Sequence, residues 1–405
     1  MTIAWEVRAL GDICEIARGG SPRPIQEFIT NDPSGVSWIK ISDATASGKY
    51  IYSTKEKITQ AGVQRSRMVN EGDFILSNSM SFGRPYIMKT SGCIHDGWLV
   101  LSDKKHVFDQ DYLYYFLGSD IAYRQFDSLA AGSTVRNLNI ESAKKVKVPL
   151  PPIAEQKRIA AILDEAFAGI AAATANAEKN LANARELFDL SLEAIFTKEG
   201  NGWVQRPFSD ICEITSKLVD PREPRFIDLP HLGAGNMVSK TGELIEIKTA
   251  REEELKSGKF LFDESMVLYS KIRPYLMKAC RPDFSGLCSA DVYPLFPKPA
   301  LLNRNFLFYL LLSRKFTEFA IGGSDRAGMP KVNRDHLFSY KAWLPDVKEQ
   351  RLLASKLDEI SSETNRIELI YQRKISALAE LKQAILQKAF SGDLTGIKTR
   401  HCEAA

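Results

Sequence analysis

Long apolar runs are missing from this sequence of 405 residues. No stretch approaches the roughly 20 consecutive apolar residues that a membrane-spanning helix needs. The first residues, MTIAWEVRALGDICEI, show no apolar segment behind a basic start, as a secretory signal would. We therefore expect a cytoplasmic chain without a membrane segment. The length fits two or three ordinary domains.

Signatures of metal and nucleotide sites are missing too. The six cysteines form no C-x-x-C pair, and the five histidines do not cluster near them, which favours free thiols over a zinc site. The nearest approach to a phosphate-binding loop, GAGNMVSKTG (233–242), has Ser239 where the glycine before the lysine belongs. Zinc-protease and serine-hydrolase motifs do not occur. We expect no catalytic site, metal or bound cofactor in this chain.

The most informative feature that is present is an internal duplication. WEVRALGDICEI (5–16) and WVQRPFSDICEI (203–214) share seven of twelve residues. LPPIAEQKRIAAILDE (150–165) and LPDVKEQRLLASKLDE (344–359) share eight of sixteen. Between these anchors, FILSNSMSFGRPYIMK (74–89) resembles MVLYSKIRPYLMK (266–278). A period near 195 residues indicates two copies of a domain with its linker.

Each copy has two kinds of sequence. Residues 1–149 and 201–345 contain short β-like runs bounded by Gly, Asp, Asn and Pro, with an amphipathic helix expected near 110–128. Residues 150–200 and 346–398 are rich in Ala, Leu, Glu and Lys and follow prolines, which predicts one long helix each. The sequence predicts an α+β fold with two globular mixed α/β domains separated by two long helices.

The two expected helices carry apolar stripes at steps of three, four or seven residues. A solitary helix of roughly 65 Å cannot bury such a stripe, so we expect an antiparallel coiled coil. The alternative is that each helix docks on its own domain. The stripes comprise Ile159, Ile162, Ala166, Ile170, Ala173, Ala177, Leu181, Ala184 and Leu187 in the first helix, and Leu353, Leu357, Ile360, Ile367, Tyr371, Leu378 and Ile385 in the second.

Several loops offer groups suited to DNA. Net charge is only +4 overall, but it divides into +2 for residues 1–149, −3 for 150–200, +4 for 201–345 and +1 for the remainder. Arginine and asparagine can read base edges, and lysine, serine and backbone amides can hold phosphates. A polar residue in such a loop can instead belong to an ordinary surface loop or cap a helix. His95, Asp96, Trp98, His231 and Asn236 are further possible contacts, for which packing or turn formation is the favoured alternative. The candidate DNA-binding residues are Arg18, Ser21, Arg23, Ser77, Asn78, Arg84, Ser133, Arg136, Asn137, Ser270, Lys271, Arg273, Arg326 and Lys331.

A Glu-Gln pair opens each expected long helix, as Glu155-Gln156 and Glu349-Gln350. An acidic residue in the first turn favours the helix dipole. That does not explain the glutamine that follows in both copies. We therefore consider the four residues candidates for packing or for binding a partner protein.

These motifs resemble the specificity (S) subunit of Type I restriction-modification systems. The similarity is carried by GDICEI (11–16), WIKISD (38–43), GSTVRNLN (132–139), VLYSKIRPYL (267–276) and most specifically by the PP-x-x-EQ element at 151–156. It extends over essentially the whole chain, twice. The second copy departs with Asp346 for the second proline and Leu353 for isoleucine.

The resemblance implies a non-catalytic, sequence-specific DNA-binding subunit. Each globular domain is then a target-recognition domain for one half of a bipartite, asymmetric site, and the helices fix the spacer. Two modification subunits supply S-adenosylmethionine and methylate adenine, and restriction and translocase subunits join them. A duplicated coiled-coil adaptor that binds only proteins is the first alternative, and an autonomous nuclease is a third reading.

Overall fold

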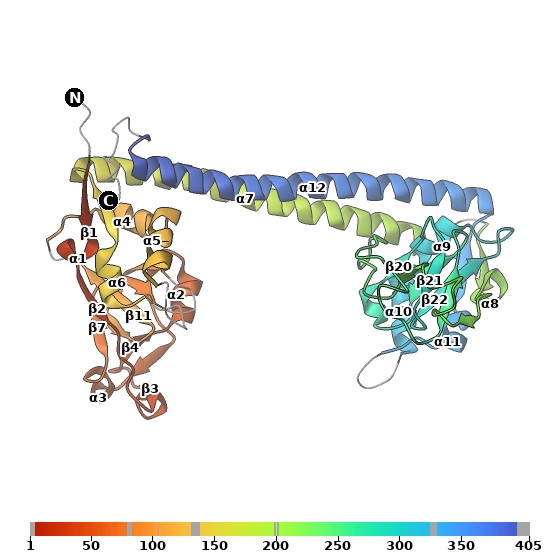
Figure 1. Ribbon diagram of the computed structural model, residues 1–405, viewed down its shortest axis with the longest axis horizontal. Coiled ribbons are helices and arrows are strands. Elements are labelled where there is room, and N and C mark those ends of the chain that lie inside the picture. The colour runs from red at the N-terminus through yellow and green to blue at the C-terminus, as the bar shows by residue number, and fades with distance from the viewer. Residues whose placement is uncertain are drawn as a thin grey trace. The chain divides into compact units, whose positions relative to one another are not determined.

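The computed structural model describes residues 5–78, 83–103, 105–130, 138–197, 200, 202–324 and 330–394. The chain divides into two compact units (Figure 1). Unit 1 comprises Met1–Asn176 with Lys374–Ala405, and unit 2 comprises Ala177–Arg373. Each unit therefore combines a globular part with the beginning of one long helix and the end of the other.

Unit 1 is built on two five-stranded mixed sheets. In sheet order, the first contains β2 (Glu15–Arg18), β11 (Trp98–Ser102), β8 (Phe74–Ser77), β9 (Pro85–Met88) and β5 (Tyr50–Ile51). The second contains β3 (Ile29–Thr30), β6 (Glu56–Ile58), β4 (Val36–Ile39), β10 (Gly92–Ile94) and β7 (Arg67–Val69). A separate antiparallel pair, β1 (Glu6–Ala9) and β12 (Lys147–Leu150), joins the beginning and end of the globular part.

Helices cover the first sheet of unit 1. The short helices are α1 (Leu10–Ile13), α2 (Ile41–Ser47), α3 (Gln60–Val63) and α6 (Ile140–Lys145), besides the 3-10 turn η1 (Ile25–Glu27). The core lies between β8, β11 and the pair α4 (Gln110–Leu117) and α5 (Asp120–Ala130), with Leu76, Leu99 and Phe116 fully buried. The single helix expected near 110–128 is two helices, because the Gly118 amide closes α4 on the Tyr114 carbonyl and the Ser119 hydroxyl caps α5 at the Ala122 amide.

Unit 2 repeats this plan. Its sheets, in order, are β14 (Cys212–Glu213), β22 (Val292–Pro297), β19 (Val267–Ser270) and β20 (Ala279–Cys280), and β15 (Leu218–Val219), β18 (Lys259–Phe262), β21 (Gly286–Cys288), β16 (Pro230–Leu232) and β17 (Lys248–Thr249). The antiparallel pair β13 (Val204–Pro207) and β23 (Lys341–Leu344) corresponds to β1 and β12. The helices are α8 (Phe208–Ile211), η2 (Pro274–Leu276), α9 (Arg304–Leu311), α10 (Arg314–Gly322) and α11 (Arg334–Ser339).

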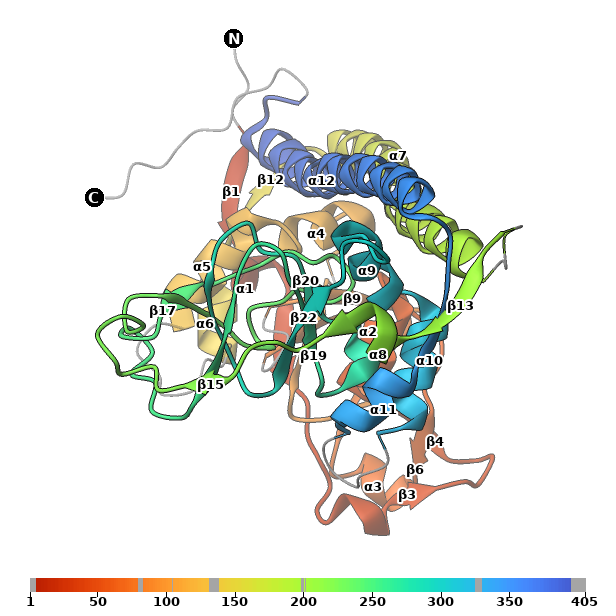
Figure 2. The same cartoon turned by 90° about the vertical axis from the view of Figure 1, so that its right-hand side faces the viewer.

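The core of unit 2 is strongly aromatic. Phe208 of α8 stacks on Phe316 of α10 with ring centroids 5.7 Å apart, and Tyr269 of β19 meets Phe316 edge-on at 5.4 Å. Helices α8, α10 and α11 accordingly gather beside β19 and β22 (Figure 2). The expected α+β fold with a twofold repeat is confirmed.

The long helices are α7 (Ile153–Phe196) and α12 (Val347–Ser391), of 44 and 45 residues. In unit 1 the core contains Ile159 and Leu163 of α7 together with Leu386, Ala389 and Phe390 of α12. In unit 2 it contains Leu192 and Phe196 of α7 together with Ala354 and Leu357 of α12. Within each unit the beginning of one helix thus lies with the end of the other, as expected for an antiparallel pair.

The helices pack on the globular parts as well as on each other, so the two expected arrangements are not exclusive. Phe390 meets the rings of Tyr112 and Phe116 edge-on, and Phe196 packs against Phe306. The predicted stripe is wrong at Leu187, which is 61% exposed.

Helix α7 also corrects one expectation from composition. By length and composition alone it could cross a membrane. Its many alanines raise hydropathy without forming an unbroken run of large apolar residues. The same helix supplies Ile159, Leu163, Leu192 and Phe196 to the two cores.

Candidate nucleic-acid interface

In unit 1, four candidate residues bond to Asp96, three of them from the segment 18–23 and the fourth, Asn78, from just after β8. Arg18 Nε donates to the Asp96 carbonyl at 2.9 Å, and Arg23 donates to the carboxylate at 3.2 Å. The Ser21 hydroxyl donates to the other carboxylate oxygen at 2.7 Å. The loop after β2 is thereby attached to the turn before β11, and both arginines stay exposed.

The Ser21 hydrogen bond, together with His95 and Arg23, holds the pKa of Asp96 below its ordinary value. Asp96 is therefore anionic at neutral pH and neutralises part of the arginine charge. Any phosphate that binds here competes with this carboxylate for Arg23.

Three expected DNA contacts are buried in this structure. Ser77 and Ser270, the last residues of β8 and β19, are 0% and 2% exposed, and Asn78 is 1% exposed. Ser77 accepts the Arg84 amide, Ser270 donates to the Ile272 carbonyl at 3.3 Å, and Asn78 donates to the Asp96 carbonyl at 3.0 Å. These side chains shape their turns, so the expectation of direct contact does not hold for them. Arg84 is exposed and lies over the Tyr86 ring at 5.7 Å.

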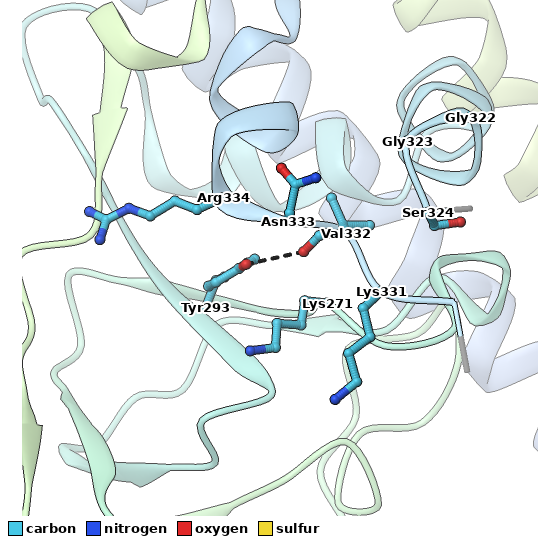
Figure 3. Close-up of a pocket in the computed structure, with 9 residues that line it drawn as sticks. All are labelled: Lys271, Tyr293, Gly322, Gly323, Ser324, Lys331, Val332, Asn333 and Arg334. Atoms are coloured by element: carbon cyan, nitrogen blue, oxygen red, sulfur yellow. Dashed lines mark hydrogen bonds between the residues drawn. The ribbon is translucent and has the colours of Figure 1, made fainter. Parts of the chain in front are cut away.

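In unit 2, two candidate lysines share one carboxylate. Lys331 Nζ lies 3.2 Å from Asp291 Oδ1, and Lys271 Nζ lies 3.5 Å from the same oxygen. Lys271 also donates to the Ala290 carbonyl at 2.6 Å. Both lysines line a cavity of about 380 Å³ (Figure 3). Its wall includes Tyr293, whose hydroxyl donates to the Val332 carbonyl at 3.1 Å.

Cross-strand pairing shows which residues are equivalent in the two units. Ser77 pairs with Trp98, and Ser270 pairs with Val292 at the same place in the sheet. The amides of Ser77 and Ser270 then donate to the carbonyls of Arg84 and Lys278. The structural counterpart of Arg84 is therefore Lys278 and not Arg273.

The Arg-Pro-Tyr sequence shared by the two copies consequently occupies different places. In unit 1, Pro85 and Tyr86 belong to β9, and Tyr86 is 1% exposed. In unit 2, Pro274 and Tyr275 belong to η2, in the turn before β20, and Tyr275 is 53% exposed. Arg273 opens this turn and is exposed as well. The similarity of 74–89 to 266–278 suggests that the two arginines are equivalent, and the strand pairing shows that they are not.

Four candidates, Ser133, Arg136, Asn137 and Arg326, lie outside the described residues. They stay predictions.

The glutamines of the repeated Glu-Gln pairs have the same internal role in both units. Gln156 Oε1 accepts the Asp109 amide at 2.8 Å, and its Nε2 donates to the carbonyls of Val107 and Pro151. Gln350 makes the matching bonds to the Asn303 amide and to the carbonyls of Leu301 and Pro345. They are 1% and 0% exposed, so neither can contact a partner directly, which corrects that expectation.

The acidic members of the pairs differ from the glutamines. Glu349 is exposed. Glu155 is partly exposed and its Oε2 lies 3.4 Å from Arg158, whereas its Oε1 is buried without a hydrogen-bond partner among the described residues. Glu349 is therefore the more accessible of the two for a partner.

The repeated Leu-Asp-Glu sequence further along each helix has an internal role as well. Asp164 accepts the Tyr115 hydroxyl, and Asp358 accepts the Tyr309 hydroxyl at 2.6 Å. Lys49 lies 3.7 Å from Asp164, and Arg281 pairs with Asp358. One of the two anchors of the duplication, 150–165 and 344–359, is therefore the part that fastens each long helix to its globular domain.

Within the described residues, no group of three or more His, Cys, Asp or Glu side chains could hold a metal. Cys14, Cys93, Cys212, Cys280 and Cys288 are free and buried, as expected, and Cys402 lies outside the described part. His95 packs beside Trp38 and Trp98, and Asn236 bonds its own loop. His231 Nδ1 lies 2.9 Å from Glu253, and burial lowers the pKa of His231.

Comparison with known proteins identifies the architecture. The family described as Type I restriction modification DNA specificity domain matches residues 3–181 and again 200–376. The Type I restriction enzyme EcoDI specificity subunit of Escherichia coli is 28% identical over 321 residues, 70% of each chain. The MjaVIII specificity subunit of Methanocaldococcus jannaschii is 23% identical over 421 residues, 96% of this chain and 93% of the relative.

Solved structures show the same fold. A chain from a structure concerned with complex assembly and conformational transition of the type I R-M system matches with a TM-score of 0.78 and 19% identity, over 96% of this chain and 98% of the other. The HsdS subunit from Thermoanaerobacter tengcongensis matches with a TM-score of 0.60 and 19% identity, over 96% and 97%. The chain therefore belongs to the Type I restriction-modification specificity family and is a non-catalytic DNA sequence-recognition subunit, as its motifs led us to expect.

Proposed function

We propose that each unit reads one half of a bipartite, asymmetric DNA site and that α7 and α12 set the length of the unread spacer. The observation that carries this is a difference at equivalent positions on one repeated fold. Asn78 and Lys271 both follow the central strand, and their amides donate to the Gly97 and Asp291 carbonyls. In unit 1 this position holds the buried side chain of Asn78, and in unit 2 it holds Lys271, whose side chain lines a cavity. Units with one fold but different polar groups fit two different half-sites.

Cationic side chains supply the contacts to DNA. In unit 1 these are Arg18, Arg23 and Arg84, and in unit 2 they are Lys271, Arg273 and Lys331. Ser133, Arg136, Asn137 and Arg326 belong to the same proposal on sequence grounds. Two recognition modules that read one face of DNA lie about one helical turn apart, roughly 34 Å. A helix of 44 residues, roughly 65 Å long, is sufficient for that span.

The partners follow from the same proposal. Two modification subunits dock on the helices, with Glu155 and Glu349 among the contacts, and they bring S-adenosylmethionine and methylate adenine in each half-site. Restriction and translocase subunits complete the assembly in the cytoplasm. The adaptor that binds only proteins is not favoured by the family.

The proposal is tested by variants confined to one unit, expressed with the rest of the system. Arg18→Ala with Arg23→Ala should relax the methylated motif in one half only, and Arg273→Ala should relax only the other half. Adenine methylation mapped across the genome measures both. If either variant altered both halves, or if the motif were continuous, assignment of one half-site to each unit would fail.

A further inference from the structure

We propose that unit 2 divides its DNA contact between two adjoining features. The turn Ile272–Met277 contacts bases through Arg273 and Tyr275, and the pair Lys271 and Lys331 holds a backbone phosphate. This rests on the proposed function and assigns separate roles within it. Tyr275 was not among the residues expected from the sequence.

The turn is held in a conformation that leaves Arg273 and Tyr275 exposed, while Pro274 is buried and Met277 packs against the core of unit 2. Arg273 and Met277, at its two ends, both have a left-handed backbone with φ of 49°. That conformation is unfavourable for residues with a Cβ and persists where the surroundings impose it, often at binding sites. Here the Arg273 amide donates to the Pro330 carbonyl at 2.9 Å, and the Met277 amide to Pro274 at 2.9 Å.

Arg273 and Tyr275 have no side-chain partner within the described residues. Tyr275 is 53% exposed and makes no hydrogen bond or ring contact there, and the exposed Arg273 side chain makes no hydrogen bond or ion pair there. An aromatic ring can pack on a base, and a guanidinium can bond a base edge bidentately. A fixed turn that offers both outward therefore fits a DNA groove.

Comparison with unit 1 shows that the fold does not require this ring. Tyr86 is buried in β9 and meets Trp98 edge-on at 5.7 Å. Its structural counterpart in unit 2 is Cys280, because Tyr86 pairs with Ile75 as Cys280 pairs with Leu268. Tyr275 therefore fills no core position that the repeated fold needs, which leaves recognition as its role.

Within the described residues the lysine pair has one carboxylate partner. Lys271 and Lys331 are 22% and 38% exposed and share the carboxylate of Asp291. Among these residues, two ammonium groups around one carboxylate leave one positive charge beside the cavity. Figure 3 shows both lysine side chains extending to the same side of the segment, whereas Arg334 extends to the other side of Tyr293. An anionic phosphate oxygen would satisfy the remaining charge.

The two features are joined through the backbone. Ile272 and Lys331 form an antiparallel bridge, and the Val332 amide donates to the Lys271 carbonyl at 2.8 Å. Arg273 of the turn and Lys331 of the pair thus belong to one short paired segment. A phosphate bound at the lysines fixes the distance between the turn and the DNA backbone, which sets where Tyr275 reaches.

The test measures DNA binding by the full-length chain assembled with its modification subunits over a series of salt concentrations. One duplex carries the sequence motif that the system methylates, and a second duplex has the half-site read by unit 2 scrambled. We expect Tyr275→Ala to weaken binding to the motif about tenfold, to leave binding to the scrambled duplex unchanged and to keep the salt dependence, because no charge is lost. Tyr275→Phe should bind as the unchanged protein does.

The lysine variants should behave in the opposite way. Lys331→Met should weaken binding to both duplexes by the same factor and reduce the slope of log K against log salt by about one. Leu218→Ala, at an exposed apolar residue of unit 2, is the control. It should leave affinity and slope unchanged, and thermal unfolding verifies that every variant is folded.

Two results would overturn the division of roles. One is equal weakening of both duplexes, or of neither, by Tyr275→Ala. The other is an unchanged slope for Lys331→Met. If scrambling the half-site did not weaken the unchanged protein, the proposed function itself would fail. If scrambling weakened it but Tyr275→Ala did not, only the present inference would fail.

Discussion

Replacement of Gln350 tests how α12 is fastened to unit 2. Gln350→Met keeps the shape of the side chain but removes three hydrogen bonds, one from the Asn303 amide and two to the Leu301 and Pro345 carbonyls, at 2.8 to 2.9 Å. Each bond contributes about 1 kcal/mol net, and a buried backbone group left without a partner costs about 1–3 kcal/mol. Because Gln350 is 0% exposed, water cannot replace them.

The loss of unfolding free energy should therefore be about 4 kcal/mol. For a unit of this size that lowers the melting temperature by about 10 °C. Denaturant unfolding measures the loss of free energy. Hydrogen exchange with mass spectrometry should locate it in unit 2, with faster exchange at the start of α9, next to the lost bonds. Glu349→Gln is the matched control, since its side chain is exposed, and it should change stability by less than about 0.5 kcal/mol. A loss below about 1 kcal/mol for Gln350→Met would refute the reasoning.

Three further predictions concern stability. Phe390→Ala should destabilise unit 1 by about 3–5 kcal/mol, because the ring is 3% exposed and packs on Tyr112 and Phe116, whereas Leu381→Ala, 48% exposed on the same helix, should have little effect in the same exchange experiment. Ile367→Glu should disrupt the helix pair in unit 2, since Ile367 is half-buried, and Ile370→Glu, 48% exposed, is its control in thermal unfolding; equal melting of the two would contradict this. Burial holds the pKa of His231 below its unfolded value near 6.5, so its stabilising contribution is present above that pH and is lost as pH falls through the lower folded value. Denaturation of His231→Gln from pH 7.5 to 5 should show a weaker pH dependence, and an unchanged profile would count against it.

Much of the architecture could be predicted because duplication and apolar periodicity are local properties of the sequence. The anchors at 5–16 and 203–214 locate equivalent β1 and β13, and the Pro-flanked, Ala-rich and Leu-rich segments contain α7 and α12. Leu187 departs because Phe188, four residues after the buried Ala184, is the residue that packs against the core of unit 2.

The site could be predicted only in part. Charged side chains such as Arg23 and Arg273 are exposed, but the small polar residues Ser77, Asn78 and Ser270 are buried, and sequence letters do not distinguish a turn-forming polar group from a contacting one. The repeated glutamines were recognised as unusual, but their partners, such as Val107 and Leu301, lie 49 residues away in the chain. The Arg-Pro-Tyr sequence occurs in both copies, but its residues are not structurally equivalent. Strand pairing decides equivalence, and it matches Arg84 with Lys278.

The central claim is that this chain directs methylation to a site with two different halves. The most direct measurement maps methyladenine in genomic DNA from the native host, with and without the gene for this chain. We predict that deletion abolishes one bipartite, asymmetric motif and no other. Persistence of every motif in the deletion strain, in a host where the modification subunits are shown to be expressed and active, would contradict the account.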